Sequence, residues 1–179
     1  LMTFTKAQAE KQADDLLGGG WTLRAQDGYY DMGRLAMLST LVPLLDKDGW
    51  LTALQERLRH YPEALRRRVM ENAMGGLRDR EEISHAAQRL EPLFYHYALD
   101  GQLDLFLQGL FALNGVYFPS RKRTLQYAAG FAKKPRELDA RLLEVLQLGG
   151  AAETLPQSYE KWLDVSNELC ALLEDELKG

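Results

Sequence analysis

The chain has 179 residues and a mass of 20.3 kDa, which suits one domain or one domain with a fragment of a second. Its 46% apolar and 27% charged residues are typical of a folded globular protein and exclude an intrinsically disordered chain. A net charge of -4 argues against a general nucleic-acid coat, and a single cysteine excludes an internal disulfide framework. No apolar run reaches the roughly 18 residues of a membrane helix and no signal-peptide pattern is visible, so we expect a cytoplasmic protein without a membrane partner.

The first fifty residues carry the only β-like pattern in the sequence. Thr5 is placed to cap a helix that continues to about Leu17, where three consecutive glycines end it. The other elements expected here are strands at 21–23 and 41–45 and turns at 27–28 and 46–49. Because Pro43 has no N–H to donate to a ladder, the second strand is expected at a sheet edge.

From Trp50 onward the apolar residues recur at helical spacing. The helices predicted after the one at Trp50 cover 62–80, 81–99, 100–118, 124–132, 135–148 and the stretch from Pro156 to the end. We expect Pro92 to kink the helix that contains it, and the helix 100–118, apolar almost all round, to be central and surrounded. The predicted fold class is mainly α, a helical bundle (residues 50–179) with a small β remnant near the N-terminus (residues 1–49).

Charge is unevenly spread along the second half of the chain. Residues 119–141 contain seven bases and two acids, whereas residues 153–178 contain seven acids and two bases. Such segments are typical of two solvated faces, and the alternative interpretation is that the basic one faces phosphate groups.

Several polar residues interrupt the apolar central helix. Asp100, Asp104 and Gln108 recur every four residues, so they form a stripe that lines a cleft or the surface, or that gains from the positive end of the helix dipole in a first turn. Asn114 is interpreted either as a satisfied core amide or as part of a site. The segment 114–123 brings an amide, a phenol and three cations together near a helix end, which is suited to contact a polyanion.

The histidines offer a weaker signal. Arg80 with His85 and Arg89 with His96 fit the loose spacing of helical ribonucleases from toxin pairs, but two such matches are close to chance in an arginine-rich chain. The three histidines have no partner at i,i+4 and no cysteine cluster, so we predict no metal site.

Three stretches resemble aminoglycoside-nucleotidyltransferase-like proteins of the polymerase-β-type superfamily: residues 44–51, residues 60–66, and residues 110–118 with Lys122-Arg123. The resemblance implies transfer of a nucleoside monophosphate from a nucleoside triphosphate to an acceptor hydroxyl, with Mg²⁺ as cofactor and a C-terminal helical domain closing one side of the cleft. By position, the residues implied to meet the nucleotide are Asn114, Tyr117, Lys122 and Arg123, and those implied to face a polar or cationic acceptor are Asp100 and Asp104.

The sequence departs from that family in its catalytic portion. It contains no Gly-Ser turn and no Asp-x-Asp pair before residue 44, and the Asp46-x-Asp48 pair lies in a turn. We therefore expect the C-terminal part of such an enzyme, or a descendant that lost the catalytic portion, with no catalytic residue, inactive alone and binding no cofactor by itself. Leu1-Met2 is not a natural start, so we expect either a tag remnant followed by Met2 or an internal fragment. The expected partner is a catalytic domain in cis or in another chain, or a second copy. The alternative is a helical interaction module that docks on a separate catalytic or toxin subunit.

Overall fold

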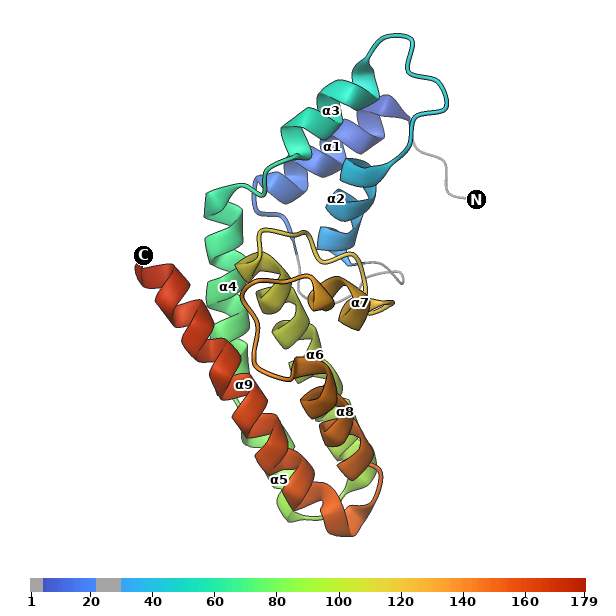
Figure 1. Ribbon diagram of the computed structural model, residues 1–179. Helices are drawn as coiled ribbons and strands as arrows, with labels where there is room; N and C mark the ends of the chain where they lie inside the picture. The colour runs from blue at the N-terminus through green and yellow to red at the C-terminus, as the bar shows by residue number, and fades with distance from the viewer. Residues whose placement is uncertain (1–4, 22–29) are drawn as a thin grey trace.

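The computed structural model describes residues 5–21 and 30–179, and within these ranges the chain forms helices and loops without a β-strand. The helices are α1 (Lys6–Leu17), α2 (Asp31–Thr40), α3 (Trp50–Leu58), α4 (Glu63–Arg78), α5 (Glu81–Gln88), α6 (Pro92–Leu113), α7 (Thr124–Ala129), α8 (Leu138–Leu148), the short 3₁₀ helix η1 (Ala152–Thr154) and α9 (Leu155–Lys178). Figure 1 shows two parts: α1, α2 and α3 at one end, which we call the front unit, and a bundle of α4, α5, α6, α8 and α9. The mainly α class is confirmed.

Helix α6 lies at the centre of the bundle, as its composition predicts. It packs against α4, α5 and α9, and α8 lies alongside α9. Every residue from Phe106 to Leu113 is buried, because partners surround this part of the helix on all sides. Trp162 of α9 is also fully buried and lies against Phe106, with 5.5 Å between ring centroids.

One glycine allows the three main helices to approach closely. A Cβ built on Gly109 of α6 would lie 2.8 Å from the Cβ of Ala73 on α4 and 3.3 Å from Leu173 on α9. The Ala73 Cβ is fixed by its own backbone and cannot turn aside. Glycine at 109 and alanine at 73 therefore set the separation of α4 and α6.

The predicted boundary between the helices 81–99 and 100–118 is wrong. Helix α5 ends at Gln88, and Pro92 begins a helix that runs unbroken to Leu113 instead of kinking one. Proline suits the first turn of a helix, where its missing N–H has no intrahelical partner. As a result Asp100 and Asp104 lie in the middle of α6, so the helix dipole does not explain them.

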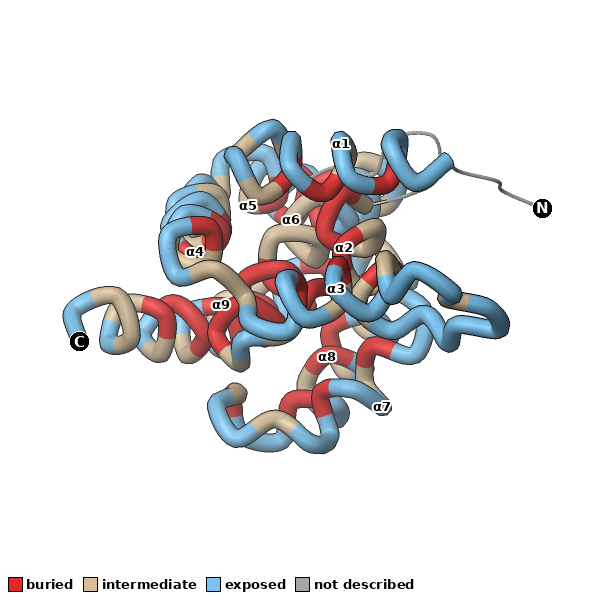
Figure 2. The backbone as a smooth tube through the Cα atoms, turned by 90° about the horizontal axis from the view of Figure 1, so that it is seen from above, coloured by how far each residue is buried: buried red, intermediate tan, exposed pale blue. Residues whose placement is uncertain are grey.

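The expected β remnant is absent from residues 5–21 and 30–49, the described part of its range. Helix α2, which was not predicted, precedes residues 41–45, and these residues form a loop that bends at Leu44 and carries no ladder hydrogen bond. The strand pattern came from apolar side chains that here face solvent, as the exposed connection between α2 and α3 in Figure 2 shows. The predicted turn 27–28 and residues 22–23 of the other strand lie outside the described residues.

Local hydrogen bonds from side chains define where two helices of the front unit begin. Thr5 caps α1 through a capping box, its side chain accepting from Gln8 N at 3.2 Å while Gln8 Oε1 accepts from Thr5 N at 2.8 Å. Asp46 holds the start of α3 by accepting from the backbone N–H groups of Leu51 (3.1 Å) and Thr52 (2.9 Å). These helices pack mainly on one another, so the junction with the bundle is made by loops.

Candidate functional site

A cavity of about 850 Å³ lies at this junction, and we call it the front cavity. Helices α2 and α3 form one wall, and the segment from Gly115 to Lys122, which follows α6, forms the other. Tyr30 and Tyr127 contribute at its margins. Its volume is in the range of small-molecule binding sites in proteins.

Positive charge predominates in the lining of the front cavity. It contains the three cations Arg34, Arg59 and Lys122, against one carboxylate, Glu56, which pairs with Arg59 at 3.3 Å. The side chains of Arg34 and Lys122 have no ion-pair partner within the described residues, and the buried Nε of Arg34 has no hydrogen bond there. Cations without an internal counter-ion favour an anionic ligand.

Phenol groups line the same cavity. Burial raises the pKa of Tyr117 to about 12, and its hydroxyl is 3.4 Å from the carbonyl oxygen of His60. Burial, together with a hydrogen bond to Asp104, raises the pKa of Tyr30 to about 12. Both phenols therefore stay protonated at neutral pH, and each donates its one proton within the chain, Tyr117 to the His60 carbonyl oxygen and Tyr30 to Asp104. Behind Tyr117, the ring of Tyr61 packs at a centroid distance of 4.4 Å.

A glycine brings the two walls together at the base of the cavity. A Cβ on Gly33 of α2 would lie 2.4 Å from the carbonyl oxygen of Pro119. Since the contact is with backbone, no side-chain rotation can relieve it. Only glycine at this position lets α2 lie so close to the segment that carries Lys122.

Asp100 and Asp104 do form one polar stripe on α6, and the structure gives both an internal partner. Arg121 donates from Nε to Asp104 at 2.7 Å, from Nη1 to the carboxylate of Asp100, and from Nη2 to the Asp100 carbonyl oxygen at 2.8 Å. Burial lowers the pKa of Arg121, but the hydrogen bonds with Asp100 and Asp104 outweigh it and raise the pKa overall. Asp104 also accepts from the Tyr30 hydroxyl at 2.6 Å. A role of the two carboxylates in acceptor binding stays a prediction.

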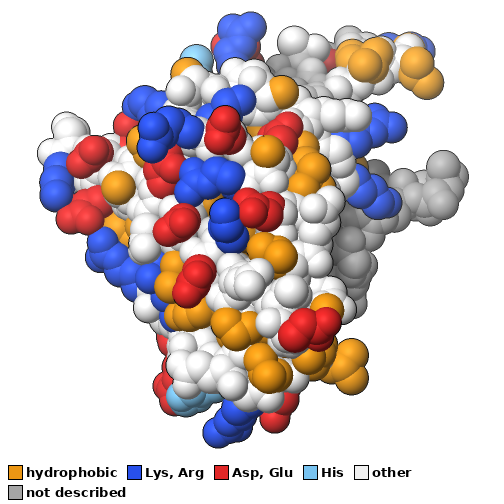
Figure 3. Space-filling model, turned by 60° about the horizontal axis from the view of Figure 1, so that its bottom comes forward, with side chains coloured by type: hydrophobic (Ala, Val, Ile, Leu, Met, Phe, Trp, Pro, Cys, Tyr) orange, Lys and Arg blue, Asp and Glu red, His pale blue; other side chains and the backbone are white. Residues whose placement is uncertain are grey.

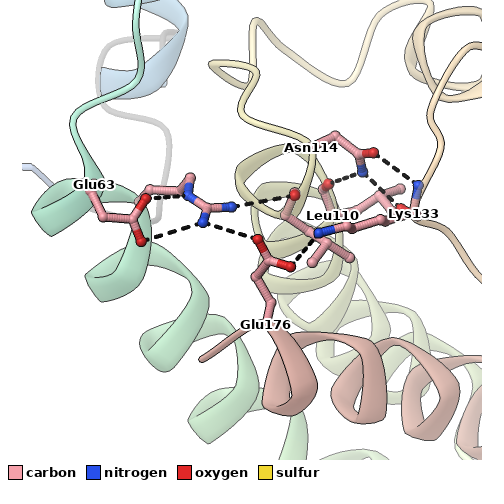
Figure 4. Close-up of polar contacts among 7 residues, drawn as sticks. Glu63, Leu110, Asn114, Lys133 and Glu176 are labelled. Atoms are coloured by element: carbon pink, nitrogen blue, oxygen red, sulfur yellow. Dashed lines mark hydrogen bonds and ion pairs between the residues drawn. The ribbon is translucent and has the colours of Figure 1, made fainter. Parts of the chain in front are cut away.

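Asn114 does not line the front cavity, and both its amide nitrogen and its amide oxygen form hydrogen bonds within the chain. Its Nδ2 donates to the carbonyl oxygens of Leu110 (2.9 Å) and Lys133 (2.8 Å), and its Oδ1 accepts from Lys133 N at 3.1 Å. Figure 4 shows these bonds joining the end of α6 to the segment after α7. The geometry is that of a satisfied structural amide, one of the two interpretations open from the sequence.

The basic and acidic segments pair with each other. Lys133 binds Glu176 of α9, which also accepts from Arg66 of α4 at 3.0 Å, and Figure 4 shows this network closing the end of the bundle. Arg141 of α8 likewise binds Glu168 of α9 at 2.5 Å. Charges of both signs are also interspersed on the face shown in Figure 3. Most of the basic segment is therefore neutralised within the chain.

The basic residues at or beside the front cavity come from both of its walls. In the basic segment, Lys122 lines the front cavity, whereas Arg123 is exposed beside it, with a left-handed backbone (φ 60°). Arg34 and Arg59, which sequence reasoning missed, come from a helix that was not predicted and from the end of α3. Their only sequence signal was a basic residue beside an apolar helical pattern, which is common on solvated helices.

The Arg and His pairs that fit the ribonuclease spacing lie outside the front cavity. Arg80 donates to Asn167 at 2.6 Å and to the Leu77 carbonyl oxygen at 2.9 Å, and neither it nor His85 lines a cavity found in the described residues. The same holds for Arg89 and His96, which are exposed. The described residues contain no group of three His, Cys, Asp or Glu arranged to hold a metal ion, and none of their helices is long and apolar enough to cross a membrane.

Residues 32–123 match the family described as "Domain of unknown function (DUF4037)". The match covers half of the chain, so the protein belongs to this family. It includes α2 to α6 and the connecting segment through Arg123, and with them both walls of the front cavity. No curated protein and no solved structure matches the chain significantly.

Proposed function

We propose that this member of the DUF4037 family is the helical, nucleotide-binding and acceptor-binding portion of a nucleotidyltransferase. Its full enzyme would transfer a nucleoside monophosphate to an acceptor hydroxyl, and a domain in cis or a partner chain would supply the catalytic carboxylates. The observation that carries the proposal is the front cavity, lined by the phenol of Tyr117 and by Arg34 and Lys122, which have no ion-pair partner among residues 5–21 and 30–179.

Each group in the cavity suits one part of a nucleotide. The guanidinium of Arg34 offers a fork of donors to phosphate oxygens, and Lys122 offers a point charge. The tyrosines supply apolar ring surface, which suits a base, and hydroxyl oxygens that can still accept a hydrogen bond from a ribose. The volume of about 850 Å³ is sufficient for a ligand of this size.

The cavity does not fit the two Mg²⁺ ions that the resemblance implies. Magnesium prefers carboxylate and other oxygen ligands, whereas the described lining contains only Glu56, already paired with Arg59. We therefore derive no chemical step through a metal in this chain. The purified chain should show no transfer with Mg²⁺ and any nucleoside triphosphate, and turnover by the pure chain would contradict the proposal.

The direct test is calorimetric titration of the purified chain with ATP, GTP, CTP and UTP at low and moderate salt. We expect binding that weakens as salt rises, because the contact is largely ionic. Lys122→Ala and Arg34→Ala should each lower the affinity roughly tenfold, the effect of one charged hydrogen bond. Absence of binding by all four nucleotides would overturn the proposed function.

Two control variants locate the effect. Lys161→Ala removes an equally exposed lysine that pairs with Glu144 at 3.0 Å on the bundle, and it should bind nucleotide like the unmodified chain. Arg123→Ala removes the cation beside Lys122 that does not line the cavity, so its effect should be smaller than that of Lys122→Ala. Equal loss in all the lysine and arginine variants would point to unspecific attraction rather than to this site.

One observation favours the alternative function, docking on another subunit. In the loop between α2 and α3, Leu44 is 99%, Val42 82% and Leu45 76% exposed. Adjacent exposed apolar side chains of this size are characteristic of interaction surfaces. If the partner is a second copy, sedimentation velocity from 1 to about 200 µM should show a dimer that Leu44→Ser abolishes. A monomer throughout that range would exclude self-association.

A further inference from the structure

Arg121 lies directly behind the front cavity, with its side chain turned toward α6. All three of its guanidinium nitrogens donate to that helix, to Asp104 at 2.7 Å, to the Asp100 carboxylate and to the Asp100 carbonyl oxygen at 2.8 Å. With every nitrogen engaged, the guanidinium has its strongest donors already spent within the chain. Arg121 is therefore not placed to be a ligand-binding group itself.

The residues on either side of Arg121 face the opposite way. Ser120 and Lys122 both line the front cavity, so fixing Arg121 also fixes the direction of its neighbours. The Ser120 hydroxyl accepts from Lys122 N at 3.1 Å, and this bond across Arg121 holds the turn that contains all three residues. Arg123, the next residue, has a left-handed backbone, which sets where α7 begins.

The same anchor reaches the other wall. Asp104 accepts from Nε of Arg121 and also from the hydroxyl of Tyr30, at 2.6 Å. Tyr30 lines the cavity and immediately precedes α2, the helix that carries Arg34. One carboxylate on the central helix thus binds both the segment that carries Lys122 and the residue that precedes the helix of Arg34. Tyr30 is further held by the ring of Phe118, 4.9 Å away edge to face.

We propose that Arg121 and Asp104 form a positioning pair that holds Lys122 and the start of α2 on opposite sides of the anion-binding site. The role rests on the proposed function for its ligand, but its structural part does not. Arg121 acts through Lys122, and Asp104 acts through Arg121 and Tyr30. Through this pair, the central helix α6 sets the distance between the two cationic walls.

A double-mutant cycle separates positioning from simple loss of charge. The probe is inorganic tripolyphosphate, which tests the phosphate contacts alone, and binding is measured by calorimetry for Arg121→Gln, Lys122→Ala and the double variant. We expect Lys122→Ala to cost roughly tenfold in the native background but less than about twofold in the Arg121→Gln background, because a displaced lysine contributes nothing to remove. Arg121→Lys, which keeps the charge and loses the fork, should resemble Arg121→Gln. Additive losses, or full rescue by Arg121→Lys, would overturn the proposal.

Hydrogen exchange of the ligand-free chain tests the structural part even if no phosphate compound binds. In Arg121→Gln, exchange should rise several-fold both in residues 116–123 and in the first hydrogen-bonded amides of α2, from Arg34 onward. The matched control is Arg78→Gln, which removes an arginine that binds Glu174 at 2.9 Å between α4 and α9. It should leave both segments unchanged. An increase confined to residues 116–123 would show that Arg121 does not hold the second wall, and the proposal would fail. Unchanged exchange together with intact binding would fail it as well.

Discussion

The bundle and the front unit differ in how many of their apolar and charged side chains have a partner within the chain. In the bundle, apolar side chains are buried around α6, and cations such as Lys133 and Arg141 have carboxylate partners on α9. At the front junction, Arg34 and Lys122 have no such partner in the described residues, and the α2–α3 loop exposes its leucines. We therefore expect the bundle to supply most of the stability, whereas the front junction supplies the side chains that remain available to bind a ligand or a partner.

The largest expected contrast compares one side chain from each part. Trp162→Ala empties a fully buried site beside Phe106 and should lower the free energy of unfolding by about 3–5 kcal/mol. Leu44→Ala changes an exposed side chain and should stay within about 0.5 kcal/mol. Urea titration of both variants checks the comparison. A cost above 1 kcal/mol for Leu44→Ala would indicate that another surface covers the loop in solution.

A pair of glycines on the same helix tests close packing against helix propensity. Gly109→Ala forces a methyl group onto Ala73 and should destabilise the bundle by about 1–3 kcal/mol. Gly101→Ala meets nothing within 4 Å and should stabilise it by about 0.5–1 kcal/mol, because alanine favours the helix. The midpoints of thermal unfolding should therefore shift in opposite directions. A gain from both substitutions would mean that α4 and α6 are not in close contact.

The smallest expected effect concerns the charge network of Figure 4 and its pH dependence. Hydrogen bonds from Lys133 and Arg66 hold the pKa of Glu176 below its ordinary value of 4.5. A depressed pKa in the folded state contributes stability above pH 4.5, which is lost as the pH falls through the folded pKa. Glu176→Gln should therefore cost about 1 kcal/mol at pH 7, and its difference from the unmodified chain should shrink below pH 4.

The matched control for this network is Glu153→Gln. Glu153 is exposed and has no ion pair in the described residues, so the substitution should change stability by less than about 0.5 kcal/mol at either pH. Urea titrations at pH 7 and pH 3.5 measure both variants. A pH-independent difference for Glu176→Gln would show that packing, not charge, explains its effect.

The sequence predicted the parts of the fold that depend on local signals. The helices 62–80 and 135–148 and the last helix from Pro156 are confirmed within a few residues, because apolar spacing and proline mark them. It failed where two signals competed. Pro92 fits both a kink and a helix start, and only the packing of α6 decides between them. Helix α2 was missed although Met32, Leu35 and Leu38 recur at helical spacing and are buried.

The candidate site was predicted only in the portion that is contiguous in sequence. Tyr117 and Lys122 lie on one short segment and do line the front cavity. Arg34 and Arg59 reach it from elements about 60 to 90 residues away, which no spacing rule can anticipate. The sequence also did not show which basic residues have a carboxylate partner. That depends on which carboxylates of α9 lie opposite Lys133 and Arg141 in the fold.

The Asn114 contacts have a consequence for how this family can diversify. Since Asn114 and Lys133 are bonded to each other in both directions, the chain between them forms a loop that is closed at the end of α6. Within this loop Phe118 and Ala128 are buried against the bundle, whereas Lys122 and Arg123 are exposed. The exposed positions can change without altering the helices beneath the loop. One wall of the front cavity therefore lies on a loop whose exposed residues can vary, and the other lies on α2 and α3. Relatives that share this amide could differ in ligand choice while retaining the same bundle.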